Sequence, residues 1–297
     1  MGKEPSLEDI SGNLLKNREA SFLDYTGIRD LKLNSEELAQ FYQGDYPIRD
    51  LLENQYVFIR DETDKIVDKF FWRAEHLERV PFVTFSSDYL GKISPRNPEQ
   101  ECAFHLLKDT KTKVKLITGR FGSGKSMSMI AQANEALEKG VVDKIVYVRN
   151  NIAVRDTSEL GALPGSEIDK LLPFLMQFAD HVGGKEALMT MIAQERLEPI
   201  HLGYLRGRDI RNSIIYVTEA QNLTVDHIKL LLGRVGEGSY LYLDGDFHAQ
   251  IDRSVFERSP GLKKLIEVLS GNRLFGYVNL VKSERSEVSA LADLLDE

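Results

Sequence analysis

The sequence predicts an α/β fold built on a mainly parallel β-sheet, and two observations support this class. From about residue 99 onward, short apolar runs rich in β-branched residues alternate with helical patterns. One such run, 114–118 (VKLIT), leads through a glycine-rich turn into a helical pattern that closes at Gly140. Alternation of this kind is typical of a parallel sheet with helices on both faces.

The elements can be predicted in chain order. Asn34, with Glu37 at capping-box spacing, predicts the cap of a helix over 31–42, and a polar turn between residues 55–60 and 66–72 predicts a β-hairpin. Later strands are expected over 114–118, 144–148, 213–217, 239–243 and 275–280. Later helices are expected over 99–107, 127–140, 168–178, 186–194, 225–232, 262–269 and 287–295.

The chain divides into three predicted parts. Residues 1–20 form a polar tail, residues 21–94 form a small β-containing region, and residues 95–297 form a nucleotide domain. The boundary is placed at the turn-rich stretch 93–98 (ISPRNP). Within the hairpin, the FFW run at 70–72 is interpreted as core, the alternative being a platform for stacking bases.

Composition limits the classes of protein that are possible. The chain has 297 residues, one cysteine and a net charge of −8, so no internal disulfide forms and a cytoplasmic setting is expected. The lone Cys102 is interpreted as an inert core residue. The start of the chain is unlike a signal peptide, and no apolar run approaches the length of about 18 residues needed to cross a membrane.

The negative net charge argues against a surface that binds nucleic acid everywhere, but it leaves room for a local basic patch. One cluster has that composition, YLRGRDIR at 204–211, with arginines at 206, 208 and 211. The alternative is ordinary solvated surface charge.

The turn after residue 118 carries the strongest motif. Residues 119–126 read GRFGSGKS, which matches G-x-x-x-x-G-K-S. Backbone N–H groups of such a loop and the start of the following helix bind phosphate, with Lys125 on the β- and γ-phosphates and the Ser126 hydroxyl on Mg²⁺. A glycine-rich turn without function is the alternative, and the flanking strand and helix favour the nucleotide site. The predicted nucleotide-binding residues of the loop are Gly119, Arg120, Phe121, Gly122, Ser123, Gly124, Lys125 and Ser126.

Polar residues follow two of the other predicted strands. In a parallel sheet, ligands lie at the carboxyl ends of the strands. Glu219 follows 213–217 and can polarise an attacking water, and Gln250 lies in the loop after 239–243, where its amide can detect a γ-phosphate. As alternatives, Glu219 could be an acid at a helix N-terminus and Gln250 an ordinary loop amide.

Taken together, several segments resemble the PhoH family of P-loop ATPases, which are related to superfamily 1 helicases. The similarity runs from about residue 24 to the end, and is closest to the ATPase part of the PIN-PhoH proteins, a group described as RNA-unwinding ribonucleases. It implies a RecA-like P-loop fold that binds ATP and Mg²⁺. The segments that carry it are 26–29 (TGIR), 119–126, 160–165 (LGALPG), 204–208 (YLRGR), 219–222 (EAQN), 234–239 (RVGEGS), 245–246 (GD), 250–252 (QID) and 284–286 (ERS).

The resemblance implies further roles. The segment 95–100 is similar to the family's adenine-reading segment, with Gln100 pairing to the base, although Gln100 could instead be an ordinary helix-surface amide. Arg285 resembles the arginine that meets the γ-phosphate, within the chain or across a subunit boundary. Family members are described as rings, so the resemblance implies a homo-oligomer such as a hexameric ring. Arg149, Arg206 and Arg208 are then candidates for an RNA-facing or subunit-facing surface.

The chain departs from the family pattern in two ways. Only about 20 residues precede the resemblance, too few for a PIN nuclease, so nuclease activity is not expected. Thr218 stands where the family has the aspartate that orders the Mg²⁺ shell, while Asp244 stands where the family has threonine. We hypothesise that the two residues have exchanged places across adjacent strands, about 4.8 Å apart, so that Asp244 supplies the metal-binding carboxylate.

These features predict an ATPase that couples Mg·ATP turnover to movement on RNA or another single-stranded nucleic acid. Two alternatives remain. One is a weakly hydrolysing nucleotide-binding ring or regulatory subunit that needs a separate partner, and the other is a small-molecule kinase, for which no acceptor-binding lid is apparent.

Overall fold

A computed structural model describes residues 25–44, 48–149, 167–247 and 260–282. The predicted tail, the LGALPG segment, Gln250, Arg285 and the predicted last helix therefore lie outside the described residues. Among the helices that are described, none combines the length and the apolar character needed to cross a membrane.

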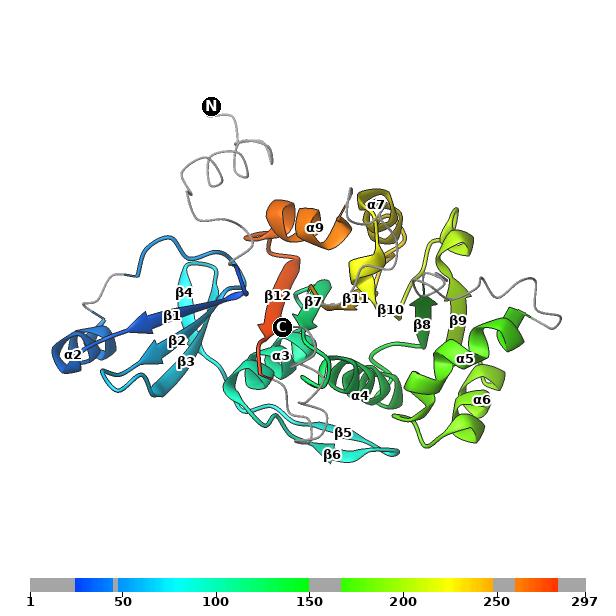
Figure 1. Ribbon diagram of the computed structural model, residues 1–297, viewed down its shortest axis with the longest axis horizontal. Coiled ribbons are helices and arrows are strands. Elements are labelled where there is room, and N and C mark those ends of the chain that lie inside the picture. Colours follow the sequence, from blue (N-terminus) through cyan, green and yellow to red (C-terminus); the bar gives the residue numbers. More distant parts are fainter. Residues whose placement is uncertain (1–24, 45–47, 150–166, 248–259, 283–297) are drawn as a thin grey trace, which may run out of the picture.

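The central feature is a six-stranded sheet in which every pairing is parallel, which confirms the predicted fold class (Figure 1). The strand order is β12-β7-β11-β10-β8-β9, so the phosphate-loop strand β7 has β11 as its neighbour. The strands are β7 (Val114–Gly119), β8 (Lys144–Arg149), β9 (Leu197–His201), β10 (Ser213–Val217), β11 (Tyr240–Gly245) and β12 (Phe275–Leu280).

Helices cover both faces of this sheet, as its apolar strands require. One face is covered by α3 (Pro98–Lys108), α4 (Lys125–Glu138), α5 (Glu167–Ala179) and α6 (Lys185–Ala193). The other face is covered by α7 (Val225–Leu232) and α9 (Gly261–Leu269). Two short 3₁₀ helices, η2 (Leu202–Leu205) and η3 (Ala220–Asn222), follow β9 and β10 at the carboxyl ends of the strands.

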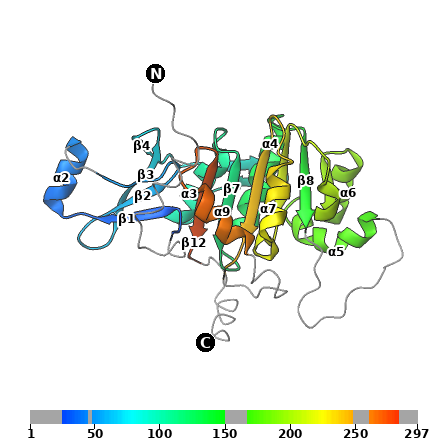
Figure 2. The same cartoon turned by 90° about the horizontal axis from the view of Figure 1, so that it is seen from above.

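A smaller sheet precedes the central one and lies at the opposite end of the molecule from α5 and α6 (Figure 2). Its order is β1-β2-β3-β4, with β1 parallel to β2 and the predicted β2–β3 hairpin confirmed as antiparallel. The elements are β1 (Ile28–Lys32), α2 (Ser35–Gln43), β2 (Tyr56–Arg60), β3 (Ile66–Arg73) and β4 (His76–Arg79). A further hairpin, β5 (Phe85–Ser87) and β6 (Gly91–Ile93), packs on α4.

The capping box of α2 is confirmed, because the Asn34 side chain accepts from the N–H of Glu37 and the Glu37 carboxylate accepts from the N–H of Asn34. The predicted start at residue 31 is wrong. Leu31 and Lys32 belong to β1, where pairing with β2 prevails over helix propensity.

The prediction that the FFW run forms core is confirmed for Phe71, which is 1% exposed, whereas Phe70 and Trp72 are half-buried. Phe71 stacks at a tilt on Tyr56, and both belong to the same apolar cluster as Phe104 of α3. The two predicted regions therefore share a core, and the proposed boundary at 93–98 stays a prediction.

Polar contacts also join the small sheet to the central one. The Asn54 amide donates to the carbonyl oxygens of Asn272, Arg273 and Phe275, at 3.2, 3.0 and 2.8 Å. The Arg73 guanidinium forms a bidentate ion pair with Asp109, which follows α3. The N-terminal region is thus held to the central sheet by buried polar groups as well as by apolar packing.

Candidate nucleotide site

The loop between β7 and α4 has the backbone of a phosphate cradle. Gly124 has φ +90° and is the N-cap of α4, a conformation that a side chain would strain. A Cβ at Gly119 would come within 2.4 Å of the Leu280 carbonyl oxygen on β12. Both glycines are therefore required by close packing and backbone conformation, and the following helix directs its N-terminus at the loop.

Lys125 is folded over this loop. Its ammonium donates to the carbonyl oxygens of Gly119 and Arg120, the latter at 3.0 Å, and it lies 5.8 Å from the ring centroid of Phe121. Phe121 is 54% exposed, so the loop presents an open aromatic ring beside the lysine. The cation is thus held where phosphoryl oxygens would enter.

Asp244 lies directly beside Ser126. The Ser126 hydroxyl donates to Asp244 Oδ2 at 2.8 Å, and the Tyr216 hydroxyl donates to the same oxygen. Asp244 pairs with Ile117 in β7, one strand from the phosphate loop, whereas β10, which leads to Thr218, is one strand further away. The hydrogen bond shows that the Asp244 carboxylate points toward Ser126, as the exchange hypothesis requires, and the metal-binding role of Asp244 stays a prediction.

The oxygen atoms at this position fit Mg²⁺, which prefers carboxylate and hydroxyl ligands and keeps several waters. Asp244 is 3% exposed and accepts only uncharged donors among the described residues: the Ser126 hydroxyl, the Tyr216 hydroxyl and the N–H of Glu219, the last at 3.0 Å. A buried carboxylate with this set of partners retains its attraction for an external cation.

Glu219 stands at the end of β10 with φ +54°, in the left-handed region that is uncommon for a residue with a side chain. Its backbone N–H donates to Asp244, and its carboxylate accepts from the Gln221 amide at 2.6 Å. Burial, with the nearby charge of Asp244 adding to it, raises the pKa of Glu219 above its ordinary value. A carboxylate with a raised pKa is suited to accept a proton near neutral pH.

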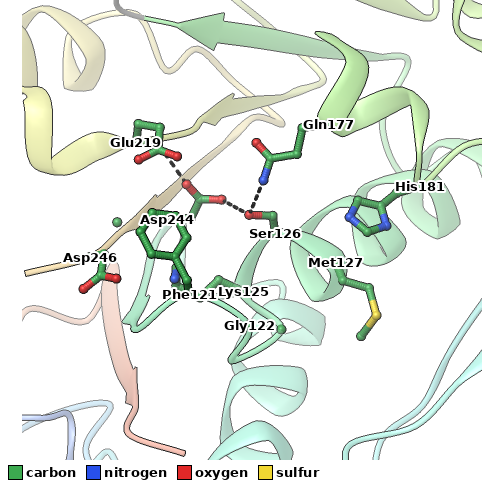
Figure 3. Close-up of a pocket in the computed structure, with 12 residues that line it drawn as sticks. Phe121, Gly122, Lys125, Ser126, Met127, Gln177, His181, Glu219, Asp244 and Asp246 are labelled. Carbon is green, nitrogen blue, oxygen red and sulfur yellow. Dashed lines mark hydrogen bonds between the residues drawn. The ribbon is translucent and has the colours of Figure 1, made fainter. Parts of the chain in front are cut away.

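These residues line one pocket of about 250 Å³, close to the lower end of the range of about 300–1,000 Å³ for small-molecule sites (Figure 3). The pocket brings together the loop, Glu219 and Asp244, as predicted from the ends of the strands. Five further residues line it that the sequence did not single out as site residues: Met127, Gln177, His181, Gly245 and Asp246. Gln177 belongs to α5 and His181 to the turn that follows it, and no motif in the sequence places that helix over the loop.

Gln100 is neither exposed nor part of the pocket lining. It is 3% exposed; its amide donates to the Ser123 carbonyl oxygen at 2.9 Å and accepts from the N–H of Arg96 at 2.8 Å. The alternative of a helix-surface amide is therefore wrong. Gln100 holds the phosphate loop against the start of α3, and its role toward adenine stays a prediction.

A second candidate surface lies beyond β8, at the edge of the sheet. Arg149 ends β8 and pairs with His201 in β9, and η2 follows directly. Tyr204 is 64% exposed because its neighbours Leu202 and Leu205 are buried and turn it outward. Its ring lies 5.8 Å from that of His201, so two aromatic rings stand at the carboxyl end of this edge.

The three arginines assigned to this surface differ in availability. Arg206 is exposed. Arg208 instead forms a bidentate ion pair with Glu198 of β9, at 2.6 and 3.1 Å. Its guanidinium is therefore already engaged within the chain, and the exposed Arg206 is the strongest of the three candidates for contact with a partner.

The sequence comparisons agree with this geometry. The family described as PhoH-like protein matches residues 92–292, which is more than half of the chain. The chain belongs to the PhoH family. The match begins next to the predicted domain boundary and contains the whole central sheet.

Individual PhoH relatives extend the similarity. Protein PhoH2 of Bacillus subtilis is 30% identical over 295 residues, covering 91% of this chain and 64% of that protein. Protein PhoH2 of Mycolicibacterium smegmatis is 33% identical over 230 residues, covering 76% of this chain and 52% of its own length. Protein PhoH of Escherichia coli K12 is 29% identical over 198 residues. The chain thus spans roughly half to two thirds of these relatives.

Proposed function

We propose that this PhoH-family protein is a Mg²⁺-dependent ATPase that couples ATP hydrolysis to the remodelling of RNA or another single-stranded nucleic acid. The observation that carries the proposal is the contact between Ser126 and Asp244 beneath the phosphate loop, with Glu219 on the same side of the pocket. Together they supply the hydroxyl, the carboxylate and the base that phosphoryl transfer to water requires.

Each residue then has a defined task. The loop N–H groups and Lys125 bind the phosphates, and Ser126 and Asp244 hold Mg²⁺, which neutralises phosphoryl charge when bound. Glu219 accepts the proton of the attacking water. Gln250 and Arg285 are proposed to contact the γ-phosphate, and Gln100 the adenine.

The same proposal assigns the surface at β8 and β9 to the single strand. Exposed aromatic rings stack on bases of any sequence, and arginines bind the phosphate backbone. The exposed Tyr204 ring, beside the half-buried His201 ring, provides the stacking surface, and Arg206 and Arg149 provide the positive charge. We further propose, from the family resemblance, that the active form is a homo-oligomeric ring, such as a hexamer, in a cytoplasmic setting.

One observation favours a second candidate, a nucleotide-binding ring or regulatory subunit with weak hydrolysis. Thr218 is buried, is neutral, and stands where a metal-ordering aspartate is expected from the resemblance. If Asp244 does not replace that aspartate, nucleotide binding would persist while hydrolysis would be weak.

The first experiment measures ATP hydrolysis with and without single-stranded RNA. We expect RNA to stimulate phosphate release by the wild-type protein, and we expect Lys125→Ala to lower the rate by about a hundredfold or more. Tight Mg·ATP binding with no stimulation by any single strand would reject the first proposal and support the second.

The nucleic-acid surface is tested with Tyr204→Ala. Loss of one stacked base costs about 1–3 kcal/mol, so the RNA dissociation constant should rise by about five- to a hundredfold. Tyr42→Ala is the matched control, because Tyr42 is 52% exposed on α2 at the far end of the molecule. Equal effects of the two substitutions would contradict the assigned surface, and a changed oligomeric state for Tyr204→Ala alone would assign it to a subunit contact instead.

A further inference from the structure

Gln177 of α5 and Asp244 of β11 both reach the Ser126 hydroxyl, from different directions (Figure 3). The Gln177 amide nitrogen donates to the Ser126 hydroxyl oxygen at 3.4 Å, while that hydroxyl donates its own hydrogen to Asp244 at 2.8 Å. Ser126 is therefore held from two elements that are distant in the sequence, α5 and β11. The first contact is long, so its contribution is to orientation more than to binding strength.

The donors and acceptors of a serine hydroxyl can be counted. The oxygen carries one hydrogen and two lone pairs. Asp244 takes the hydrogen and Gln177 occupies one lone pair, so one lone pair remains for a cation. Without the amide, the hydroxyl would be fixed by Asp244 alone and could rotate about that single bond.

We propose that Gln177 is a positioning residue for the metal: it fixes the Ser126 hydroxyl so that the remaining lone pair is presented to the divalent cation of the bound nucleotide. This inference rests on the proposed function, since it assumes that a metal–nucleotide complex occupies the pocket. It adds α5 to the elements that build the metal site.

The packing of α5 makes this role possible. Leu175, Phe178 and Ala179 are at most 1% exposed, so the helix is anchored on both sides of Gln177. The Phe178 ring contacts Tyr147, with centroids 5.5 Å apart, and Tyr147 contacts Tyr216 at 5.6 Å.

Tyr216 is also the residue whose hydroxyl donates to Asp244. The two groups that hold Ser126 thus rest on one buried aromatic cluster, formed by Phe178, Tyr147 and Tyr216. A shared rigid support keeps the amide and the carboxylate in fixed relative positions, as a preorganised metal site requires.

The test replaces Gln177 by methionine, which keeps the length of the side chain and removes its donor. With the full chain and ADP bound, Mn²⁺ affinity is measured by electron paramagnetic resonance, and ADP affinity is measured in EDTA. We expect Gln177→Met to weaken Mn²⁺ binding by about tenfold and to change ADP binding in EDTA by less than about twofold. Unchanged Mn²⁺ affinity, or an equal loss of ADP affinity in EDTA, would overturn the proposal.

A double-mutant cycle with Ser126→Ala shows whether Gln177 acts through Ser126. Once the hydroxyl is gone, Gln177→Met should have no further effect on Mn²⁺ affinity, whereas additive losses would overturn the proposal. Met176→Ala is the control on the same helix, since Met176 is 39% exposed and does not line the pocket. If the wild-type protein binds ADP no better with Mg²⁺ than in EDTA, the proposed function itself fails, independently of Gln177.

Discussion

Two aspartates at opposite ends of the central strands have opposite surroundings. Asp109 precedes β7, at the amino end of the sheet, and the Arg73 guanidinium pairs with both of its oxygens. Asp244 is the last residue but one of β11, at the carboxyl edge, and within the described residues no lysine or arginine forms an ion pair with it. The first carboxylate is neutralised from inside the chain, and the second is left with its charge.

These different surroundings change the pKa of Asp109 itself and, beside Asp244, the pKa of Glu219. Burial alone would raise the pKa of Asp109, but hydrogen bonds from Arg73 and Thr112 hold it well below its ordinary value. Burial raises the pKa of Glu219, and the charge of Asp244 raises it further. The Asp109 carboxylate is thus stabilised as an anion, whereas the negative charges of Glu219 and Asp244 repel each other when no cation is bound.

The largest expected effect separates the two aspartates by stability. Asp109→Asn leaves the Arg73 guanidinium, whose side chain is 12% exposed, without its counter-charge, and should lower the free energy of unfolding by about 3 kcal/mol. Asp244→Asn removes a negative charge beside Glu219. The asparagine amide can still form hydrogen bonds with the same hydroxyl and N–H partners, so the free energy of unfolding should change by less than about 1 kcal/mol.

Urea unfolding of the two variants measures this difference in stability. Mg²⁺-dependent ADP binding measures the corresponding difference in metal affinity. Asp244→Asn should weaken Mg²⁺ binding by about 10–100-fold, and Asp109→Asn should leave it unchanged. The contrast between the two aspartates breaks down if Asp244→Asn is the more destabilising variant.

The sequence was sufficient for the pocket's central groups because they follow a simple rule. Residues 119–126, Glu219 and Asp244 all come directly after apolar strands, and parallel strands end at one edge of a sheet. The exchange of Thr218 and Asp244 could be proposed because the resemblance to the PhoH family shows which two residues depart from its pattern.

The remaining features depend on packing that no local pattern records. Gln177 and Ser126 are 51 residues apart in the sequence, and they meet only because α5 packs on Tyr147 through Phe178. The strand β9 escaped prediction because its sequence, LEPIH, contains a proline and little alternation, which an edge strand tolerates. The sequence could not show that Arg208 is engaged, because its partner Glu198 belongs to this unpredicted strand.

Lys115 is a buried cation near the same end of the sheet as Asp109, and it differs from Asp109 in having no ion-pair partner among the described residues. It is 1% exposed, its ammonium donates to the Leu107 carbonyl oxygen at 2.6 Å, and burial lowers its pKa to about 7 in spite of the attraction of Asp109. In the unfolded chain the pKa is near 10.5, so between these values the unfolded state binds more protons. The free energy of unfolding therefore rises with pH between about 7 and 10.5 because of Lys115.

Lys115→Met should stabilise the protein by about 2 kcal/mol near neutral pH, because the cost of burying a lysine exceeds the hydrogen bond and the two cation–π contacts, with Tyr240 and Tyr242, that are lost. The Tyr242 hydroxyl lies 3.4 Å from the Leu107 carbonyl oxygen but donates to the Gln132 side-chain oxygen at 2.5 Å, so the Leu107 oxygen loses its main donor. Urea unfolding between pH about 7 and about 9 should show stability rising with pH more steeply in the wild type than in the variant. A destabilised variant, or equal slopes, would show that the buried cation is already compensated.

The smallest expected effect concerns Glu219, whose pKa is raised above the 4.5 of an unperturbed glutamate. Above that value the folded state binds more protons than the unfolded state, so stability falls as pH rises. Glu219→Gln should remove this dependence and stabilise the protein by up to about 1 kcal/mol near pH 7, while lowering ATP hydrolysis by at least about a hundredfold.

Glu237→Gln is the matched control, because Glu237 is exposed and distant from the pocket lining. Unfolding curves between pH about 5 and about 7 should superimpose for Glu237→Gln and the wild type, and should diverge for Glu219→Gln. Adding Mg²⁺ and ADP should shrink that divergence, since a bound cation offsets the repulsion between Glu219 and Asp244. If the divergence persists unchanged with metal and nucleotide, the charge at the pocket does not serve cation binding, and the contrast with Asp109 loses its functional meaning.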